Sequence, residues 1–323
     1  MQVRRFIRKA LIFSLPLLAW VLVVVWVDPF DYFNLSHAFP EQTKIDNAAA
    51  LNTLVFNMLK EKHAPSEYLI IGDSRAEALP VEYIRHLTGQ PYFQLAAYSL
   101  KLNESIDLFY FANRLKPVKR AVFTLNFNEF NEYAYADRVS SVEAMIQNPF
   151  IYCFDRGVAQ AAYYVVKASL TGRKWIGSIP PMTSQEWWDY MVKVRGREHY
   201  EKYAYPQRLY QRMQEMVRFA KKQGVEITFI DVPNHADFQK RVRDFGLADQ
   251  YVRFKKQMCS LGVRVIDYDY LNHITAEKSN FRDPLHYNEQ IGRMISEEVF
   301  RGPVIEGRLL DAARADQYSQ YSF

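Results

Sequence analysis

The segment YLIIGDSR, residues 68–75, decides the fold expected for this chain. A short apolar run opens it, and Gly72 and Asp73 then end the run with residue types that favour a turn. A strand without polar alternation is typical of a parallel sheet that helices cover on both faces. Ser74 follows the turn, so we expect it at the carboxyl edge of the sheet, where open α/β sheets bind their ligands.

Strands and helices alternate along the chain on both sides of this segment. Apolar runs predict further strands at residues 91–98, 119–127, 224–232 and 262–269. Helical segments are expected between and after them, at residues 80–89, 104–116, 237–258 and 288–300. The alternation predicts an α/β fold, a parallel sheet in a three-layer α/β/α arrangement.

Residues 130–215 interrupt the alternation. They are aromatic-rich, helical in pattern and broken by a Pro-Pro pair, and we interpret them as a helical insertion that serves as a lid or a partner surface. The α/β domain is therefore expected over residues 65–301. A connector at residues 28–64 precedes it, and a loosely held C-terminal tail at residues 302–323 follows it.

The N-terminal end has the pattern of a membrane anchor. Residues 1–9 carry four Lys or Arg side chains, and residues 10–27 form one apolar run that reaches about 27 Å as a helix, enough for a bilayer core. The positive-inside rule predicts a single-pass protein of the cytoplasmic membrane, with residues 1–9 in the cytoplasm and the domain in the periplasm or extracytoplasmic space. A cleaved signal peptide and a buried soluble helix are the alternatives, although the bulky residues after position 22 offer no small-x-small cleavage site.

Composition excludes several other classes of protein. The 323 residues are 49% hydrophobic and 24% charged, which is typical of a globular protein and not of a disordered one. The formal net charge of +5 is too small to indicate a nucleic-acid partner. The His and Cys residues have no metal-ligand spacing and no phosphate-binding Gly motif is present, so we expect no metal and no cofactor. Cys153 and Cys259 could pair or remain free buried thiols.

Two short motifs carry residues of catalytic type. The hydroxyl of Ser74 is a weak nucleophile unless a base lies beside it. In DPLH, residues 283–286, Asp283 can hydrogen-bond one imidazole nitrogen of His286 and leave the other free to take a proton. The simpler alternatives are that Ser74 or Asp283 caps a helix and that His286 is a surface residue.

A third motif, NFNE at residues 126–129, closes the strand at residues 119–127. Attack on an ester carbonyl creates an oxyanion that needs preorganised donors, and an Asn amide at the end of a strand can supply one. Asn126, Asn128 and Asn131 compete for this role, and each could instead be a turn residue.

These three motifs, in this order on an alternating scaffold, resemble those of the SGNH (GDSL-type) hydrolase superfamily. The resemblance implies an SGNH or flavodoxin-like fold, with Ser74 as nucleophile, His286 as base and Asp283 as the residue that orients the base. It also implies an oxyanion hole formed by Ser74 and Asn128 with a backbone N–H from a second block, where the family has Gly and this chain has Ala96.

The anchored members that this chain resembles act on cell-envelope polymers, for example in alginate and other exopolysaccharide O-acetylation and in D-alanylation of lipoteichoic acid by DltD. The resemblance implies a serine esterase or O-acyltransferase that forms an acyl-enzyme on Ser74, takes its acyl group from a donor, and works on a polysaccharide beside a membrane-bound O-acyltransferase. The alternative is a non-catalytic scaffold or glycan-binding protein with the same fold.

Several further residues are candidates for substrate binding. Arg75 could hold an anionic group or lie in solvent, and His235 could line the cleft or be an ordinary loop residue. Asn126 is a third candidate. The aromatic residues of the insertion could stack on sugar rings or pack within the insertion: Trp187, Trp188 and Tyr190.

Overall fold

The computed structural model describes residues 2–172, 174 and 182–311, and these form two compact units. One unit comprises Met1–His63 and Arg138–Ile179, and the other comprises Ala64–Asp137 and Pro180–Phe323. The interval at residues 130–215, expected to be one insertion, is therefore divided between the two units. Its first part packs with the N-terminal helices, and its second part belongs with the sheet.

The second unit is built on a six-stranded sheet in the order β2-β1-β3-β4-β5-β8. The first five of these in chain order are parallel: β1 (Tyr68–Gly72), β2 (Phe93–Ala96), β3 (Arg120–Leu125), β4 (Glu226–Asp231) and β5 (Arg264–Asp267). The predicted parallel α/β sheet is thus confirmed. The antiparallel edge strand β8 (Arg308–Leu309) pairs with β5, so the segment expected to be a loose tail contributes a strand.

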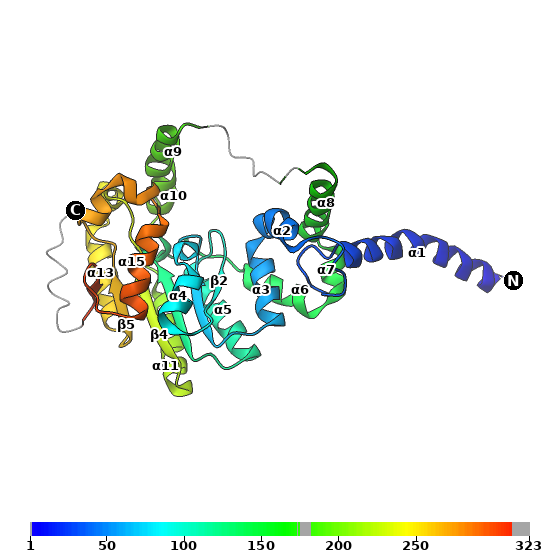
Figure 1. Cartoon of the computed structure of the whole chain (residues 1–323), viewed down its shortest axis with the longest axis horizontal. Helices are drawn as coiled ribbons and strands as arrows, with labels where there is room; N and C mark the ends of the chain where they lie inside the picture. The colour runs from blue at the N-terminus through cyan, green and yellow to red at the C-terminus, as the bar shows by residue number, and fades with distance from the viewer. Residues whose placement is uncertain (1, 173, 175–181, 312–323) are drawn as a thin grey trace. The chain divides into compact units, whose positions relative to one another are not determined.

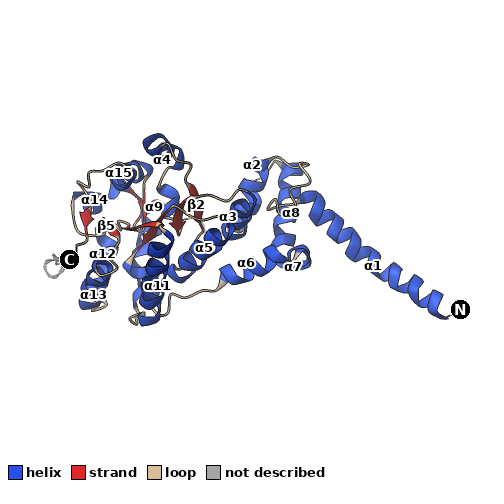
Figure 2. Cartoon of the chain, turned by 90° about the horizontal axis from the view of Figure 1, so that it is seen from below, coloured by secondary structure: helices blue, strands red, loops and turns tan. Residues whose placement is uncertain are grey.

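Helices cover both faces of this sheet (Figures 1 and 2). On one face α4 (Val81–Thr88) packs against α15 (Glu289–Phe300), and on the other α5 (Leu102–Leu115) packs against α11 (Gln207–Gln223). Strand residues such as Ile70 of β1 are fully buried between these layers, as expected for strands with two covered faces.

The remaining helices of this unit are short. The helix expected at residues 237–258 is two helices, α12 (Ala236–Asp244) and α13 (Ala248–Cys259), because the chain turns at Gly246 with a φ of 68°. The others are η2 (Ala76–Ala78), η3 (Phe127–Glu129), α9 (Ser184–Tyr190), the π-helical turn η4 (Met191–Arg195), α10 (Gly196–Tyr200), α14 (His273–Ala276) and η5 (Lys278–Asn280).

The strand order places a topological switch point between β1 and β3. The chain leaves β1 for β2 on one side, and after β2 it crosses to the other side of β1 to form β3. The loops that follow β1 and β3 therefore diverge, which opens a crevice at their carboxyl ends, where ligands bind in sheets of this kind. Ser74 follows β1 and Asn128 follows β3, so both lie at this crevice.

The first unit is helical. Its elements are α1 (Gln2–Val27), α2 (Glu41–Lys44), the π-helical turn η1 (Ile45–Ala49), α3 (Thr53–His63), α6 (Arg138–Gln147), α7 (Pro149–Phe154) and α8 (Arg156–Thr171). Within α1, Arg4–Val27 is long and apolar enough to cross a membrane. Cys153 of this unit and Cys259 of the other are both buried free thiols.

Candidate active site

The structure brings Ser74, His286 and Asp283 into one hydrogen-bonded series. The Oγ atom of Ser74 lies 2.9 Å from Nε2 of His286, and Nδ1 of His286 lies 2.8 Å from Oδ2 of Asp283. Both Ser74 and His286 are half-buried, so the pair is reachable from solvent. This is the geometry of a Ser–His–Asp triad, although the residues that carry the hydroxyl and the imidazole are 212 positions apart.

A small hairpin holds Asp283 opposite His286. Strands β6 (Phe281–Asp283) and β7 (His286–Tyr287) are antiparallel, and their register pairs Asp283 directly with His286. The two residues between them form the turn, and the backbone N–H of His235 donates to the carbonyl of Pro284 at 2.9 Å. The three-residue spacing seen in the sequence is therefore enough to pair the carboxylate with the imidazole.

Two contacts bring this hairpin to Ser74. The hydroxyl of Tyr287 donates to the carbonyl oxygen of Arg75 at 2.8 Å. In α15, a Cβ atom at Gly292 would lie 1.8 Å from the carbonyl oxygen of Ala78, so only glycine lets this helix approach the turn that follows Ser74. We infer that this close approach fixes the distance between the hydroxyl and the imidazole.

The carboxylate of Asp283 is well supplied with donors. It accepts hydrogen bonds from the backbone N–H groups of Leu285 and His286 at 2.9 and 3.1 Å, and from the indole of Trp187 at 3.4 Å. Burial raises the pKa of Asp283, but the hydrogen bond and charge of His286 and these donors hold it below its usual value overall. Asp283 is therefore ionised at neutral pH, and Trp187, expected either to stack on sugars or to pack in the insertion, supports the triad from α9.

Arg75 is buried and paired with two carboxylates of its own chain. Its side chain is 3% exposed; Nε donates to Asp73 at 3.0 Å and Nη2 contacts Glu129 at 2.5 Å. Its burial excludes the solvated alternative, and its charge is paired with acids of its own chain while it also lines a cavity beside Ser74. Its Nη1 also donates to Oδ1 of Asn128 at 3.2 Å, which leaves Nδ2 of that amide as the donor on the side of the cavity.

The pKa values of the two acids that contact Arg75 are shifted in opposite directions. Burial raises the pKa of Asp73, but the charge of Arg75 and hydrogen bonds from Glu129 and Arg75 lower it overall to about 2. Burial, together with the neighbouring charge of Asp73, raises the pKa of Glu129 well above its ordinary value.

This arrangement predicts a pH-dependent stability that belongs to Glu129. Because the folded state raises its pKa, its stabilising contribution is complete below the ordinary value of 4.5 and is lost as the pH rises toward the folded value. Glu129→Gln places a neutral amide at this position. When the pH is raised from about 5 to about 8, the free energy of unfolding of the variant should therefore fall less than that of the wild type. Chemical denaturation at both pH values measures this; parallel profiles in the two proteins would contradict it.

A cavity of about 80 Å³ lies beside Ser74, and it corrects the expected second block of the oxyanion hole. Ala96 is buried at the end of β2 and does not line this cavity, whereas Ser99 does. Ser99 has a φ of 53°, a left-handed backbone conformation that favours glycine. The loop after β2 therefore reaches the cavity at Ser99, three residues beyond Ala96.

Asn126 and His235 do not line this cavity either. Asn126 is fully buried; its Nδ2 donates to the carbonyl of Val232 at 2.9 Å and its Oδ1 accepts from Asn234 at 2.9 Å. The Nδ1 of His235 accepts from the N–H of Asp237 at 3.1 Å, which caps α12. Both side chains are used inside the protein, although both residues follow strands of the sheet as expected.

The segment at residues 191–202 contributes side chains to the site that the sequence did not indicate. His199 lines the cavity beside Ser74, and its Nδ1 lies 3.5 Å from Nδ2 of Asn128. Burial, with the charges of Arg195 and Lys101, lowers the pKa of His199 to about 3, so this ring is neutral and can accept a hydrogen bond. No spacing to another catalytic motif marks His199, so the sequence holds no signal that would have found it.

A wider groove of about 380 Å³ shares residues with this cavity, among them Lys101, Asn128 and His199. Its other lining residues include the exposed ring of Tyr133, the basic side chains of Arg195, Arg197 and Lys202, and the acidic side chains of Glu198 and Glu201, so with Lys101 basic groups outnumber acidic ones. Arg195 pairs with Glu198.

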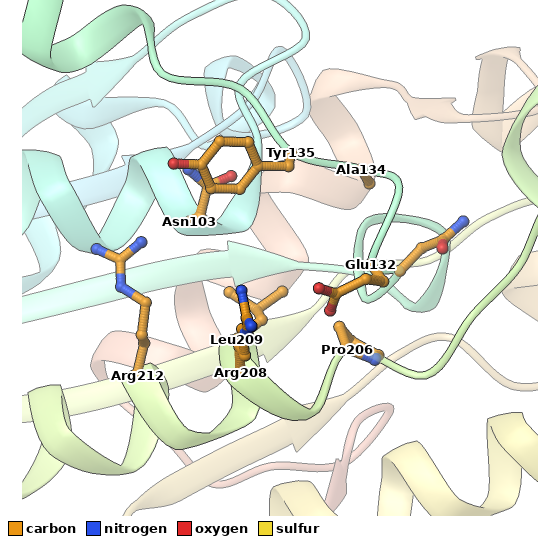
Figure 3. Close-up of a pocket in the computed structure, with 9 residues that line it drawn as sticks. Asn103, Glu132, Ala134, Tyr135, Pro206, Arg208, Leu209 and Arg212 are labelled. Carbon is orange, nitrogen blue, oxygen red and sulfur yellow. The ribbon is translucent and has the colours of Figure 1, made fainter.

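Asn131 and Ala134 of the groove also line a separate cavity of about 380 Å³ (Figure 3). There Glu132 and Arg208 come from different segments of the chain, while Arg212 is paired with Asp107 at 2.6 Å.

Among the described residues, no group of three or more His, Cys, Asp or Glu side chains could hold a metal ion.

The site thus combines a hydrogen-bonded Ser–His–Asp series with the carboxyl edge of a parallel α/β sheet. No protein-family model matches the sequence, and no curated protein matches it. Similar solved structures include a "putative platelet activating factor" from Streptococcus pneumonia, at 9% identity over 77% of this chain and 92% of that one, with a TM-score of 0.40.

Two further structures are similar to the same degree. They are a "putative acylhydrolase" from Bacteroides fragilis, at 9% identity over 75% and 95% of the two chains with a TM-score of 0.39, and a "putative lipolytic protein of G-D-S-L family" from Desulfitobacterium hafniense, at 9% identity over 73% and 98% with a TM-score of 0.36.

Proposed function

We propose that this chain is a membrane-anchored SGNH-type serine esterase or O-acyltransferase that acts on O-acyl groups of a cell-envelope polysaccharide. The observation that carries the proposal is the series from Ser74 Oγ to His286 Nε2 at 2.9 Å and from His286 Nδ1 to Asp283 at 2.8 Å. A hydroxyl with an oriented imidazole beside it is the arrangement that activates serine as a nucleophile.

The reaction follows from these contacts. As Oγ of Ser74 attacks the acyl carbonyl, Nε2 of His286 takes the hydroxyl proton, and the ionised Asp283 stabilises the imidazolium through Nδ1. The tetrahedral oxyanion accepts hydrogen bonds from Nδ2 of Asn128 and the N–H of Ser74. As the intermediate collapses, the bond to the alcohol oxygen breaks and the leaving alcohol takes the proton from His286. Water or a glycan hydroxyl then gives its proton to His286, attacks the serine ester, and releases the acid or the new ester while Ser74 regains its proton.

The envelope part of the proposal is supported by the N-terminal helix and by the groove. Arg4–Val27 can cross a bilayer, and the basic residues before the apolar run favour a cytoplasmic N-terminus. The groove that shares Lys101, Asn128 and His199 with the cavity at Ser74 has more basic than acidic side chains, which suits a glycan that carries acidic groups. The acyl donor and a membrane-bound O-acyltransferase as partner remain part of this proposal.

Activity-based labelling tests the proposal directly. A fluorophosphonate probe reacts with an activated serine and not with an idle one. The detergent-solubilised full-length chain should be labelled, and His286→Ala should not, because the base is lost while the hydroxyl remains. Absence of labelling in the wild type would favour the alternative, a non-catalytic scaffold or glycan-binding protein.

The Asn128 amide is expected to act mainly in the transition state. Asn128→Ala removes the side-chain donor, so kcat for an aryl acetate should fall by about 10²- to 10³-fold while KM changes little. Steady-state kinetics measure both values, and Gln207→Ala, which removes an exposed amide at the start of α11, is the control. A kcat near that of the wild type in Asn128→Ala would remove this residue from the mechanism.

The groove predicts a difference between polymeric and small substrates. Replacing Arg197 and Lys202 together by Glu should raise KM for an acetylated acidic polysaccharide at least about tenfold more than KM for an aryl acetate, because only the polymer extends into the groove. The matched control is the double replacement of Lys221 and Lys222 by Glu at the far end of α11. Equal effects on both substrates, or an equal effect of the control, would contradict this use of the groove.

A further inference from the structure

Helix α7 (Pro149–Phe154) has no polar face. Its sequence is PFIYCF; Tyr152 and Cys153 are buried, and Phe150, Ile151 and Phe154 are exposed, Phe150 to 73%. Strongly polar residues occur only at its ends, where Asn148 caps the start of α7 and Asp155 caps the start of α8. A helix that is apolar all round is normally covered by a protein core or by lipid, and three large exposed side chains on one short helix form an apolar patch.

The position of this patch is fixed relative to α1. The indole N–H of Trp20 donates to the carbonyl oxygen of Cys153 at 2.8 Å, and Tyr32 stacks on Tyr152 with ring centroids 4.2 Å apart. Both views show α7 beside the C-terminal part of α1 (Figures 1 and 2). Because Trp20 is seven residues before Val27, α7 lies about 10 Å below the end of the helix at a rise of 1.5 Å per residue.

A bilayer around α1 would therefore reach α7. The segment Arg4–Val27 extends roughly 36 Å, a few ångströms more than the hydrocarbon core of about 30 Å. With Val27 near the outer surface of the hydrocarbon core, a helix about 10 Å below it lies within the outer leaflet, close to the depth of about 5–10 Å to which interfacial helices bury their apolar faces.

The neighbouring helix α8 has the composition of a membrane interface. Tyr163 and Leu170 are exposed on it, and the ammonium of Lys167 lies 5.7 Å from the centre of the Tyr163 ring. Aromatic rings with a long basic side chain beside them are typical of residues that bridge acyl chains and head groups.

We propose that α7 is embedded in the outer leaflet of the membrane that α1 spans, with Phe150, Ile151 and Phe154 in contact with lipid. The proposal rests on the anchoring role of α1 and is independent of the chemistry at Ser74. The helical unit is then held by the bilayer at two places, by a spanning helix and by an interfacial one, so that it cannot rotate freely about its anchor.

Spin labelling of the full-length chain in phosphatidylcholine and phosphatidylglycerol vesicles tests this directly. Single cysteines replace Phe150, Ile305 in the other unit, which is also 73% exposed, and Leu15 within α1. The wild-type chain, with its two buried thiols, measures background labelling. Collisions with oxygen, which concentrates in lipid, are compared with collisions with a water-soluble nickel chelate.

The three labelled positions distinguish the proposed placement of α7 in the membrane from the proposed anchoring by α1. The label at Phe150→Cys should collide more with oxygen than with nickel, as the label at Leu15→Cys does, while Ile305→Cys shows the reverse. Lipid exposure at position 15 with water exposure at position 150 would overturn the placement of α7 and leave the anchor intact. Water exposure at position 15 would overturn the anchor itself, and with it this inference.

Discussion

Ser74→Ala is expected to lose hydrolysis of an aryl acetate almost completely, by on the order of 10⁴- to 10⁶-fold in kcat. The Ser74 hydroxyl is half-buried and its hydrogen bond is to the side chain of His286, so the variant should keep the fold and its thermal unfolding temperature. What it loses is the bond-forming atom: with no hydroxyl, no acyl-enzyme can form, and the residual rate is that of water in the same pocket.

The measurement compares kcat/KM of the purified full-length variant with that of the wild type. Ser279→Ala, at an exposed serine near the DPLH hairpin, is the matched control and should retain wild-type kinetics. Unchanged activity in Ser74→Ala would end the mechanism proposed above. Loss of activity together with loss of the folded state would call for Ser74→Cys, which keeps a nucleophile in place.

Lys255→Met should give the largest loss of stability. The ammonium of Lys255 contacts Asp231 and lies 2.7 Å from Asp267, and all three side chains are at most 3% exposed. Burial and the neighbouring acids raise the pKa of Asp231, and the lysine is the cation that opposes them. Removing one partner of a buried ion pair leaves uncompensated charge in the interior, at a cost of about 3–5 kcal/mol.

Denaturation of the full-length variant, with circular dichroism as the signal, measures this cost. Lys222→Met, at an exposed lysine on α11, is the control and should change the free energy of unfolding by less than about 0.5 kcal/mol. A loss below about 1 kcal/mol in Lys255→Met would mean that the acids are neutral in the folded state and need no cation.

The same cluster connects stability to the site. Nδ2 of Asn126 donates to Asp231 at 3.3 Å and to Asp269 at 3.2 Å, and Oδ1 of Asn126 accepts from the N–H of Asn128 at 3.4 Å. The acids at the ends of β4 and β5 thus hold the turn that presents Asn128. Asn126, expected as a substrate ligand, contributes to the site by positioning its neighbour.

Features of the site that depend on short segments could be predicted from the sequence. Asp283 and His286 face one another because a two-residue turn between antiparallel strands requires it, and Ser74 and Asn128 follow β1 and β3 because apolar runs end at polar turns. Ser99, which lines the cavity three residues beyond Ala96, could not be predicted, because the path of the loop after β2 depends on its packing. The prediction of residues 130–215 as a single insertion was also too coarse, because a helical pattern does not indicate which core a helix packs against.

The sequence by itself determined the alternating strands and helices, the order of the three motifs and the apolar N-terminal helix, since each depends on residue types within a few positions of one another. Only the tertiary structure decided that His286 meets Ser74, through the close approach at Gly292 and the hydrogen bond from Tyr287. It alone decided that Arg75 is buried between Asp73 and Glu129. Whether a polar side chain meets solvent, substrate or another residue depends on what packs over it, and those atoms come from distant parts of the chain.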